Sequence, residues 1–174
     1  MFFTSDHHFG HRAIIELCAR PFADVDEMNE TMVNRWNRAV GRHDEVWHLG
    51  DFGFRGGGDL KREIFDRLNG RKRLVIGNHD NGATLALPWS APPVHLAVVQ
   101  SAGKRIVMCH YGLRVWPGLH HGAIHLYGHS HGKLPGNSLS LDVGVDAWDF
   151  RPASIEEIRE HLGNLPAYAD PEHG

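Results

Sequence analysis

The sequence predicts a mixed α/β domain in which two sheets pack together and helices flank them. Short apolar runs that end in glycine or polar residues recur along the chain, as is typical of buried strands. In the first half these runs alternate with amphipathic helical patterns, which favours parallel pairing. In the second half two runs flank a short turn, which indicates a hairpin. The chain of 174 residues is long enough for one domain, expected over residues 1–164.

Five apolar runs are predicted to be strands, and each is followed by Asp, Asn or His. These runs cover residues 2–5, 45–49, 73–76, 105–109 and 124–127. In the hairpin, residues 94–99 pair with residues 104–109, and a further strand is expected within residues 139–145. Functional sites of α/β sheets lie beyond the carboxyl ends of the strands, so the polar residues that follow the strands can form one cluster.

Apolar residues at helical spacing predict four helices. Three of them cover residues 11–19, 26–40 and 59–68. Asp24 or Asp26 can cap the second helix. Ser154 and Glu157 have the spacing of a capping box, which begins the fourth helix. Residues 165–174 contain two prolines and few apolar side chains, so a flexible tail is expected there.

Composition and charge narrow the classes of function. Apolar residues make up 41% of the chain and charged residues 22%, which is ordinary for a soluble globular protein. A net charge of −3 gives no global basic field for nucleic-acid binding, although a nucleic-acid substrate could still be reached through metals. No apolar run approaches the roughly 20 residues of a membrane span, and the first residues do not resemble a signal peptide. Cys18 and Cys109 form no spaced pair, which favours a reducing, cytoplasmic setting.

The 15 histidines are the outlier of the composition, and metal binding and proton transfer explain them better than packing does. Side chains two residues apart on an extended backbone point the same way. Asp6 and His8 can therefore share one metal, with His7 directed elsewhere. His129 and His131 have the same relation.

The polar residues at the strand ends include seven candidate metal ligands. They are Asp6, His8, Asp51, Asn78, His110, His129 and His131. Seven ligands exceed one tetrahedral site and suit two metals that share a bridge, for which Asp51 has two oxygens. Two divalent ions, two carboxylates and one hydroxide leave a single positive charge, which attracts an anion; phosphate esters fit this best.

Five motifs carry a resemblance to a known family. Asp6-x-His8, Gly50-Asp51, Gly77-Asn78-His79-Asp80, His110 and Gly128-His129-x-His131 resemble, in order, the motifs of calcineurin-like metallophosphoesterases. The resemblance covers about three quarters of the chain. The segments 9–12 and 142–148 are further similar to those of small single-domain bacterial or phage-type members of this family.

The resemblance implies a fold and a division of the ligands. The fold is a four-layer α/β sandwich of two mixed sheets flanked by helices. One metal is held by Asp6, His8, Asp51 and His131, and the other by Asp51, Asn78, His110 and His129. His79 matches the family's catalytic histidine, which contacts the phosphate and protonates the leaving oxygen. Asp80 is expected to orient the His79 ring by accepting its other N–H, although the family more often has Glu at this position.

The implied activity is metal-dependent hydrolysis of phosphate mono- or diesters, with a metal-bridging hydroxide as nucleophile. The substrate would be a small phosphate ester or a nucleotide. Mn is the cofactor that the resemblance favours, while the ligand types also admit Fe, Zn, Ni, Co or Mg. One alternative is a nuclease that uses the same centre on DNA or RNA. Another is a non-catalytic scaffold of the same fold, which the complete ligand set disfavours.

Three further residues are candidates for contact with the substrate. His11 follows the first ligand pair, but it could equally begin the first helix. Arg55 follows Asp51, but it opens a glycine-rich run that could be only a flexible loop. Arg114 lies in a loop with Trp116 and the pair His120-His121, where the alternative is a set of solvated loop residues.

Three polar residues near the candidate ligands are predicted to be structural. His48 lies inside an apolar run, so a core histidine or one that supports a ligand is more plausible than a ligand. Asp142 and Asp146 are expected to hold loops by hydrogen bonds to backbone N–H groups.

Overall fold

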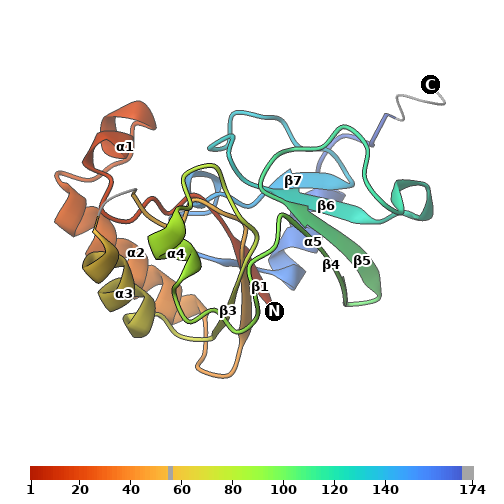
Figure 1. Cartoon of the computed structure of the whole chain (residues 1–174). Helices are drawn as coiled ribbons and strands as arrows, with labels where there is room; N and C mark the ends of the chain where they lie inside the picture. Colours follow the sequence, from red (N-terminus) through yellow and green to blue (C-terminus); the bar gives the residue numbers. More distant parts are fainter. Residues whose placement is uncertain (55–56, 170–174) are drawn as a thin grey trace.

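Two four-stranded mixed sheets pack against each other in the computed structural model, which describes residues 1–54 and 57–169 (Figure 1). The strand order is β3-β2-β1-β8 in the first sheet and β4-β5-β6-β7 in the second. Helices flank the sheets. The fold class predicted from the sequence is therefore confirmed.

The first sheet has a parallel core. Its strands are β1 (Phe2–Thr4), β2 (Glu45–His48), β3 (Arg71–Leu74) and β8 (Ala153–Ser154). β1, β2 and β3 pair in parallel, as their alternation with helices predicts, and β8 joins the far side of β1 antiparallel. The carboxyl ends of the three parallel strands thus lie at one end of the sheet.

The second sheet is built on the predicted hairpin. Its strands are β4 (Leu96–Ser101), β5 (Lys104–Cys109), β6 (Ile124–Tyr127) and β7 (Ser140–Asp142). The β4–β5 turn is tighter than predicted, because Ala102 and Gly103 have φ of 49° and 74° and close it with two residues. β6 and β7 add in parallel, so β5 and β6 end on the same side of this sheet.

Alternating side chains divide the apolar residues of the first sheet between two cores. Phe3 and Trp47 contribute to the core between the sheets, where they meet Ile106 and Leu126 of the second sheet. Their neighbours on the strands, such as Val46, belong to the core beneath the helices. This period of two is the pattern of a strand buried on both faces.

The helices are α1 (Arg12–Leu17), α2 (Val25–Ala39), α3 (Gly58–Arg67), α4 (Gly82–Leu85) and α5 (Ile155–Gly163). α2 and α3 lie side by side and cover the first sheet (Figure 1). Asp24 caps α2, since its carboxylate accepts from the N–H groups of Asp26 and Glu27. The capping box of Ser154 and Glu157 is present at α5. The four-residue α4 was not predicted.

The outer face of the second sheet is covered by a loop and a 3-10 turn, η1 (Leu119–His121). Val107 of β5 packs there against Trp116, Leu119 and Ala123. A second 3-10 turn, η2 (Val145–Ala147), follows β7.

Residues 165–169 belong to the segment for which a flexible tail is predicted, and they contact the rest of the domain. The Ser138 N–H donates to the Pro166 carbonyl at 2.8 Å, and the Tyr168 N–H donates to Ser138 Oγ at 3.0 Å. Leu165 packs on the core between the sheets. Residues 170–174 lie outside the described part of the chain, so the flexible tail stays a prediction.

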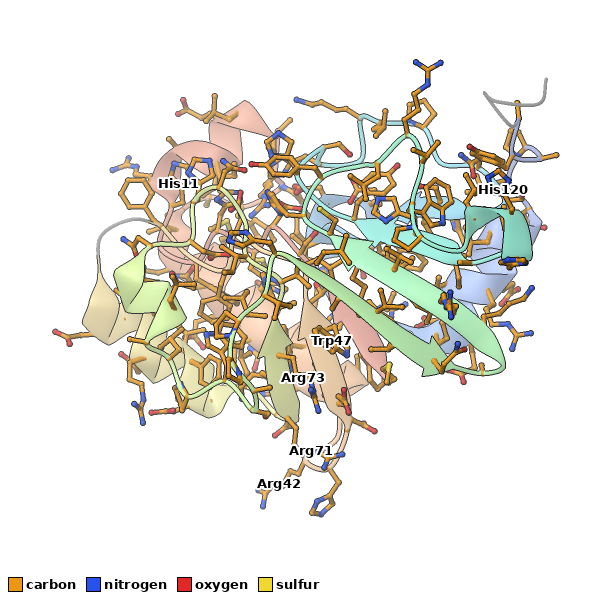
Figure 2. The ribbon with its side chains drawn as sticks, turned by 45° about the vertical axis from the view of Figure 1, so that its right-hand side comes forward. His11, Arg42, Trp47, Arg71, Arg73 and His120 are labelled. Carbon is orange, nitrogen blue, oxygen red and sulfur yellow. The ribbon has the colours of Figure 1, made fainter. Side chains whose placement is uncertain are left out.

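The two ends of the first sheet differ in what they carry. Figure 2 shows His11 at the end where the loops after the parallel strands lie, and Arg42 and Arg71 at the opposite end. The seven candidate metal ligands follow the ends of β1, β2, β3, β5 and β6. Among the described helices, none combines the length and the apolar character that crossing a membrane requires.

Candidate metal centre

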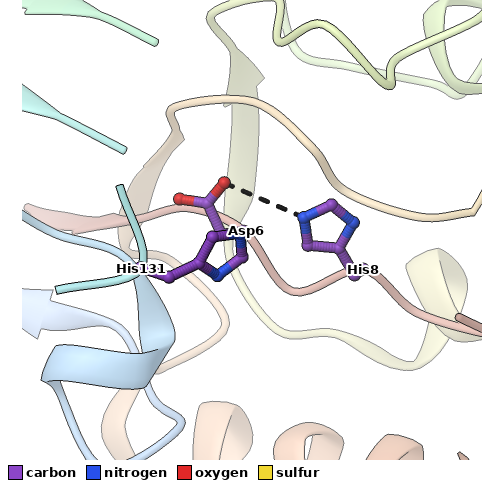
Figure 3. A group of neighbouring side chains, drawn as sticks. All are labelled: Asp6, His8 and His131. Carbon is purple, nitrogen blue, oxygen red and sulfur yellow. Dashed lines mark ion pairs between the residues drawn. The ribbon is translucent and has the colours of Figure 1, made fainter. Parts of the chain in front are cut away.

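The structure brings the predicted ligands together in two groups. The first group is Asp6, His8 and His131, and Figure 3 shows these side chains facing one another. The second group is Asp51, His110 and His129. Within each group, one ligand atom from each residue lies within 4.8 Å of the others.

Asp51 lies between the two groups. Its Oδ2 atom is 3.6 Å from His8 Nε2 in the first group and 3.5 Å from His110 Nε2 in the second. A single carboxylate therefore reaches both sets of donors, as a bridging ligand must.

Asn78 completes the second group. Its Oδ1 atom lies 2.9 Å from His110 Nε2 and 3.0 Å from His129 Nδ1. One neutral oxygen and two imidazole nitrogens thus converge beside Asp51. Oxygen and nitrogen donors of this kind suit first-row divalent metals.

The backbone at the ligands is not extended, contrary to the premise of the spacing argument. Asp6, His8, Asp51, His129 and His131 have φ between 49° and 66°, in the left-handed region. His7 still points away from the site, as predicted, but His129 and His131 enter different groups. A left-handed conformation costs on the order of 1–3 kcal/mol at a non-glycine residue, and such residues cluster at functional sites.

Two motif glycines allow the close approach of the ligand loops. A Cβ atom at Gly128 would lie 2.3 Å from Ser5 Oγ and 2.5 Å from Asp6 Oδ2. A Cβ atom at Gly77 would lie 2.3 Å from Asp51 Oδ1. Any side chain at these positions would push the loops apart and separate the ligands.

Asp6 is completely buried, and one of its oxygens lacks a partner among the described residues. Oδ2 accepts from Ser5 Oγ at 2.6 Å and from the His129 N–H at 2.8 Å. Oδ1 has no hydrogen bond and lies 4.0 Å from His8 Nε2. Burial raises the pKa of Asp6 to about 7, because the charged form loses its hydration.

Asp146 orients His131 instead of only holding a loop, which corrects the prediction for this residue. His131 Nδ1 lies 2.7 Å from Asp146 Oδ2, so the other ring nitrogen is left for the site. The buried Arg20 donates to both oxygens of Asp146 at 2.8 Å and to the Asp6 carbonyl at 2.7 Å. Asp142 acts as predicted, since it accepts from the N–H groups of Gly132 and Gly144.

His110 is held by a backbone carbonyl. Its Nδ1 atom lies 2.7 Å from the Leu49 carbonyl oxygen and donates to it, so Nε2 is directed at Asp51 and Asn78. Burial alone would raise the pKa of Asp51, but its interaction with the His110 imidazole and the hydrogen bond from the His79 N–H outweigh it and hold this pKa at about 2. Asp51 is therefore ionised throughout the working range of pH.

His79 lies beside the first group, but Asp80 does not orient it. The His79 ring is 5.3 Å from the His8 ring, and its backbone N–H donates to Asp51 Oδ1 at 2.8 Å. The Asp80 carboxylate accepts from the N–H groups of Asp51, Phe52 and Gly77 at 2.9–3.0 Å. Among the described residues, no hydrogen bond joins it to the His79 ring. Asp80 thus holds the Asp51 loop, because three backbone donors engage its short side chain.

His48 supports the core behind the site, as predicted. Its Nε2 atom lies 2.9 Å from His7 Nδ1, and both rings are completely buried. Burial lowers the pKa of His48 to about 3, so the ring is neutral in the folded protein.

The three candidate substrate contacts have different outcomes. His11 begins the first helix, since it is the N-cap of α1. Its ring lies 5.4 Å from the His8 ring, and its contact with the substrate stays a prediction. Arg114 is exposed and lines a cavity of about 430 Å³. Arg55 lies outside the described residues. His120, from the same loop as Arg114, is far from His11 across the molecule (Figure 2).

The donor set fits divalent metal ions. Asp6 Oδ1 and both ring nitrogens of His8 are buried without a hydrogen-bond partner among the described residues. A buried polar atom left unpaired costs about 1–3 kcal/mol, and more if it is charged. A cation between Asp6 and His8 would bind one of these atoms in each residue. Cation binding would therefore offset the free-energy cost of burying them without hydrogen-bond partners.

Comparison with known proteins finds relatives in sequence and in fold, and none of them identifies a function for this chain. No protein-family model matches the chain. The uncharacterized protein MJ1445 of Methanocaldococcus jannaschii is 29% identical over 166 residues, which cover 91% of this chain and 88% of that protein. The gene 66 protein of Mycobacterium phage L5 is 28% identical over an alignment of 201 positions, gaps included, which covers 94% of this chain and 94% of that protein.

A solved structure shares the arrangement of sheets and helices. AQ665 of Aquifex aeolicus, a protein of unknown function, superposes with a TM-score of 0.73 at 23% identity, covering 92% of this chain and 98% of that one. The likeness at this identity concerns the fold alone. The function must therefore be argued from the site itself.

Proposed function

We propose that this protein is a metal-dependent phosphoesterase with a two-metal centre. Asp6, His8 and His131 would hold one ion, Asn78, His110 and His129 the other, and Asp51 would bridge the two. The observation that carries the proposal is the position of Asp51, whose Oδ2 lies 3.5–3.6 Å from a ring nitrogen of each group.

Two divalent ions bound there would supply Lewis acidity, a bound water of lowered pKa and positive charge for the transferred phosphoryl group. The protein's part is to fix the donors before the substrate arrives. Arg20 and Asp146 orient His131, Leu49 orients His110, and Asp80 holds the loop of Asp51. Mn is the ion we propose first, because the resemblance to calcineurin-like metallophosphoesterases favours it; the nitrogen and oxygen donors also admit Fe, Zn, Ni, Co or Mg.

We assign proton transfer to His79. Its ring lies beside His8 and is half-buried, so it borders the first group and is still reached by solvent. An imidazole in this position can contact the phosphate and protonate the leaving oxygen. The hydrogen bond from the His79 N–H to Asp51 fixes the backbone of this residue relative to the bridging ligand.

The proposal is tested by hydrolysis of p-nitrophenyl phosphate and bis-p-nitrophenyl phosphate by metal-stripped protein, with Mn, Mg, Zn and Ni added back singly. Metal-dependent release of p-nitrophenol is expected. Release from the diester identifies a phosphodiesterase, and release from the monoester alone identifies a phosphatase. A folded protein that binds two ions but releases p-nitrophenol from neither ester would contradict the proposal and favour a scaffold.

A further inference from the structure

A cavity of about 430 Å³ is lined by residues that are close in sequence to His110 and His129 of the metal centre, and we infer that it holds the nucleoside part of a nucleotide substrate. The inference rests on the proposed phosphoesterase function and adds the class of substrate. The cavity is lined by residues of the loop after β5, the end of β6, the segment that leads to β7 and the chain after α5.

Two lining residues are close in sequence to metal-centre residues. Gly112 is two residues after His110, and Tyr127 is two residues before His129. Consecutive Cα atoms are 3.8 Å apart, so each of these pairs of Cα atoms is separated by at most about 8 Å. One small molecule can therefore place a phosphate at the metal centre and its organic part in the cavity.

Tyr111 connects the two places. Its ring lies 5.0 Å from the His110 ring and 4.8 Å from the His129 ring, and it directly precedes Gly112 of the cavity. Tyr111 is 46% exposed. It offers a ring surface at the point where a substrate would pass from the metal centre to the cavity.

Much of the cavity lining is apolar or aromatic. Leu113, Leu134 and Pro135 contribute aliphatic surface. The Trp116 indole N–H donates to the Ala123 carbonyl, and the Tyr127 hydroxyl donates to the Leu134 carbonyl. These donors are engaged within the protein, and Trp116 and Tyr127 are only 6% and 1% exposed, so the two rings back the wall of the cavity. Such a lining suits a flat ring with apolar faces.

The polar groups of the lining define the edges of the ligand. Arg114, Asn137 and Ser140 line the cavity, and no described lining residue is acidic. Asn137 Oδ1 accepts from the Leu139 N–H, so the amide NH₂ group is the part left for a ligand. Hydrogen-bond donors predominate among these polar groups. They favour a ligand ring with acceptor atoms, such as a nucleobase, because an acyl chain would leave the donors without hydrogen-bond partners.

The test compares two esters that share one leaving group. Thymidine 5′-p-nitrophenyl phosphate and methyl p-nitrophenyl phosphate differ only in the nucleoside. The Mn-loaded protein is expected to prefer the nucleoside ester by at least about tenfold in kcat/KM, which corresponds to about 1.4 kcal/mol. In Leu134→Trp the added bulk fills the cavity, so the preference should fall toward one while hydrolysis of the methyl ester persists.

Val115→Trp is the matched control. Val115 and Leu134 are both 47% exposed, but Val115 does not belong to the lining. This variant should keep the preference of the unmodified protein. An equal loss in both variants would overturn the inference, because the effect would then not depend on the cavity.

Failure of the inference and failure of the proposed function give different results. If the methyl ester is hydrolysed and the nucleoside ester is not preferred, the cavity assignment is wrong and the phosphoesterase stands. If neither ester is hydrolysed with any metal, calorimetric binding of thymidine to the metal-free protein decides. Binding that Leu134→Trp weakens at least tenfold and Val115→Trp leaves unchanged supports the cavity; no binding to the unmodified protein overturns it.

Discussion

The two ligand groups differ in how deeply the protein encloses them. Asp6 and His8 of the first group are buried and His131 is half-buried. The second group combines buried Asp51 and His110 with exposed Asn78 and His129. The first group is also the better supported, since Arg20 and Asp146 fix His131 and the peptide of Asp6. If the proposed ions bind, we expect the first to be held more firmly within the fold and the second to face the solvent.

The strand order accounts for part of this difference. β1 lies inside the first sheet between β2 and β8, whereas β3, which precedes Asn78, is an edge strand. His129 and His131 both follow β6, which lies between β5 and β7, so the strand order does not explain why His129 is the more exposed of the two.

The largest effect is expected from Asp51→Asn, which removes the charge shared by the two groups. Both ions should be weakened at once, and kcat/KM should fall by more than about a hundredfold because the electrostatic centre is lost. Elemental analysis of the dialysed variant should find fewer than two metals per chain. Full occupancy by two ions would show that Asp51 is not the bridge; circular dichroism checks that the variant is folded.

The next effect is on turnover without loss of metal. His79→Ala should keep both ions and lose about 10²–10⁴-fold in kcat for an alkyl phosphate ester, since general acid catalysis contributes about this much. The loss should be smaller for a p-nitrophenyl ester, because p-nitrophenolate leaves readily without a proton. Equal losses with both leaving groups would exclude His79 as the acid.

Asp146→Asn sharpens the comparison between the groups. Loss of the carboxylate that orients His131 should weaken the first ion about 10–100-fold and leave the second unchanged. Calorimetric titration of the metal-free protein resolves the two binding steps. The control is Asn78→Ala, which should weaken the second ion alone. If both variants weaken the same step, the two groups are not separate sites.

The smallest effect concerns the core behind the centre. The pKa of His48 is lowered to about 3, below its unfolded value of 6.5, so its contribution to stability is present above pH 6.5 and is lost as the pH falls toward 3. The slope is about 1.4 kcal/mol per pH unit for one proton. Urea unfolding of metal-free His48→Gln should show a pH dependence shallower by about this slope. Identical slopes in the two proteins would falsify the burial of a neutral His48.

The seven candidate ligands could be found from the sequence because each follows a short apolar run and is of a metal-binding type. The left-handed backbone at five of these residues could not be predicted from the sequence. Asp and His adopt a left-handed φ where the surrounding contacts impose it, and those contacts are not local in the sequence. The same limit explains why His129 and His131 separate, although their spacing predicts a shared metal.

Residues that support the ligands were missed for a different reason. Arg20 and Asp146 are 126 positions apart, and no motif around either residue predicts that the two side chains form an ion pair. The sequence predicts that Asp80 accepts a hydrogen bond from the His79 ring, but Asp80 accepts from backbone N–H groups instead. Every residue except proline has such a group, so the sequence does not show which of them Asp80 binds. The fold was more readable, because alternating burial and helix caps are local properties of the chain.

The central claim is that two ions bind side by side with Asp51 between them. Anomalous diffraction from crystals grown with Mn²⁺ tests it most directly. We expect two anomalous peaks about 3.5–4 Å apart. One ion should be bound by Asp6, His8 and His131, and the other by Asn78, His110 and His129. A single peak, or two peaks that do not share Asp51, would contradict it.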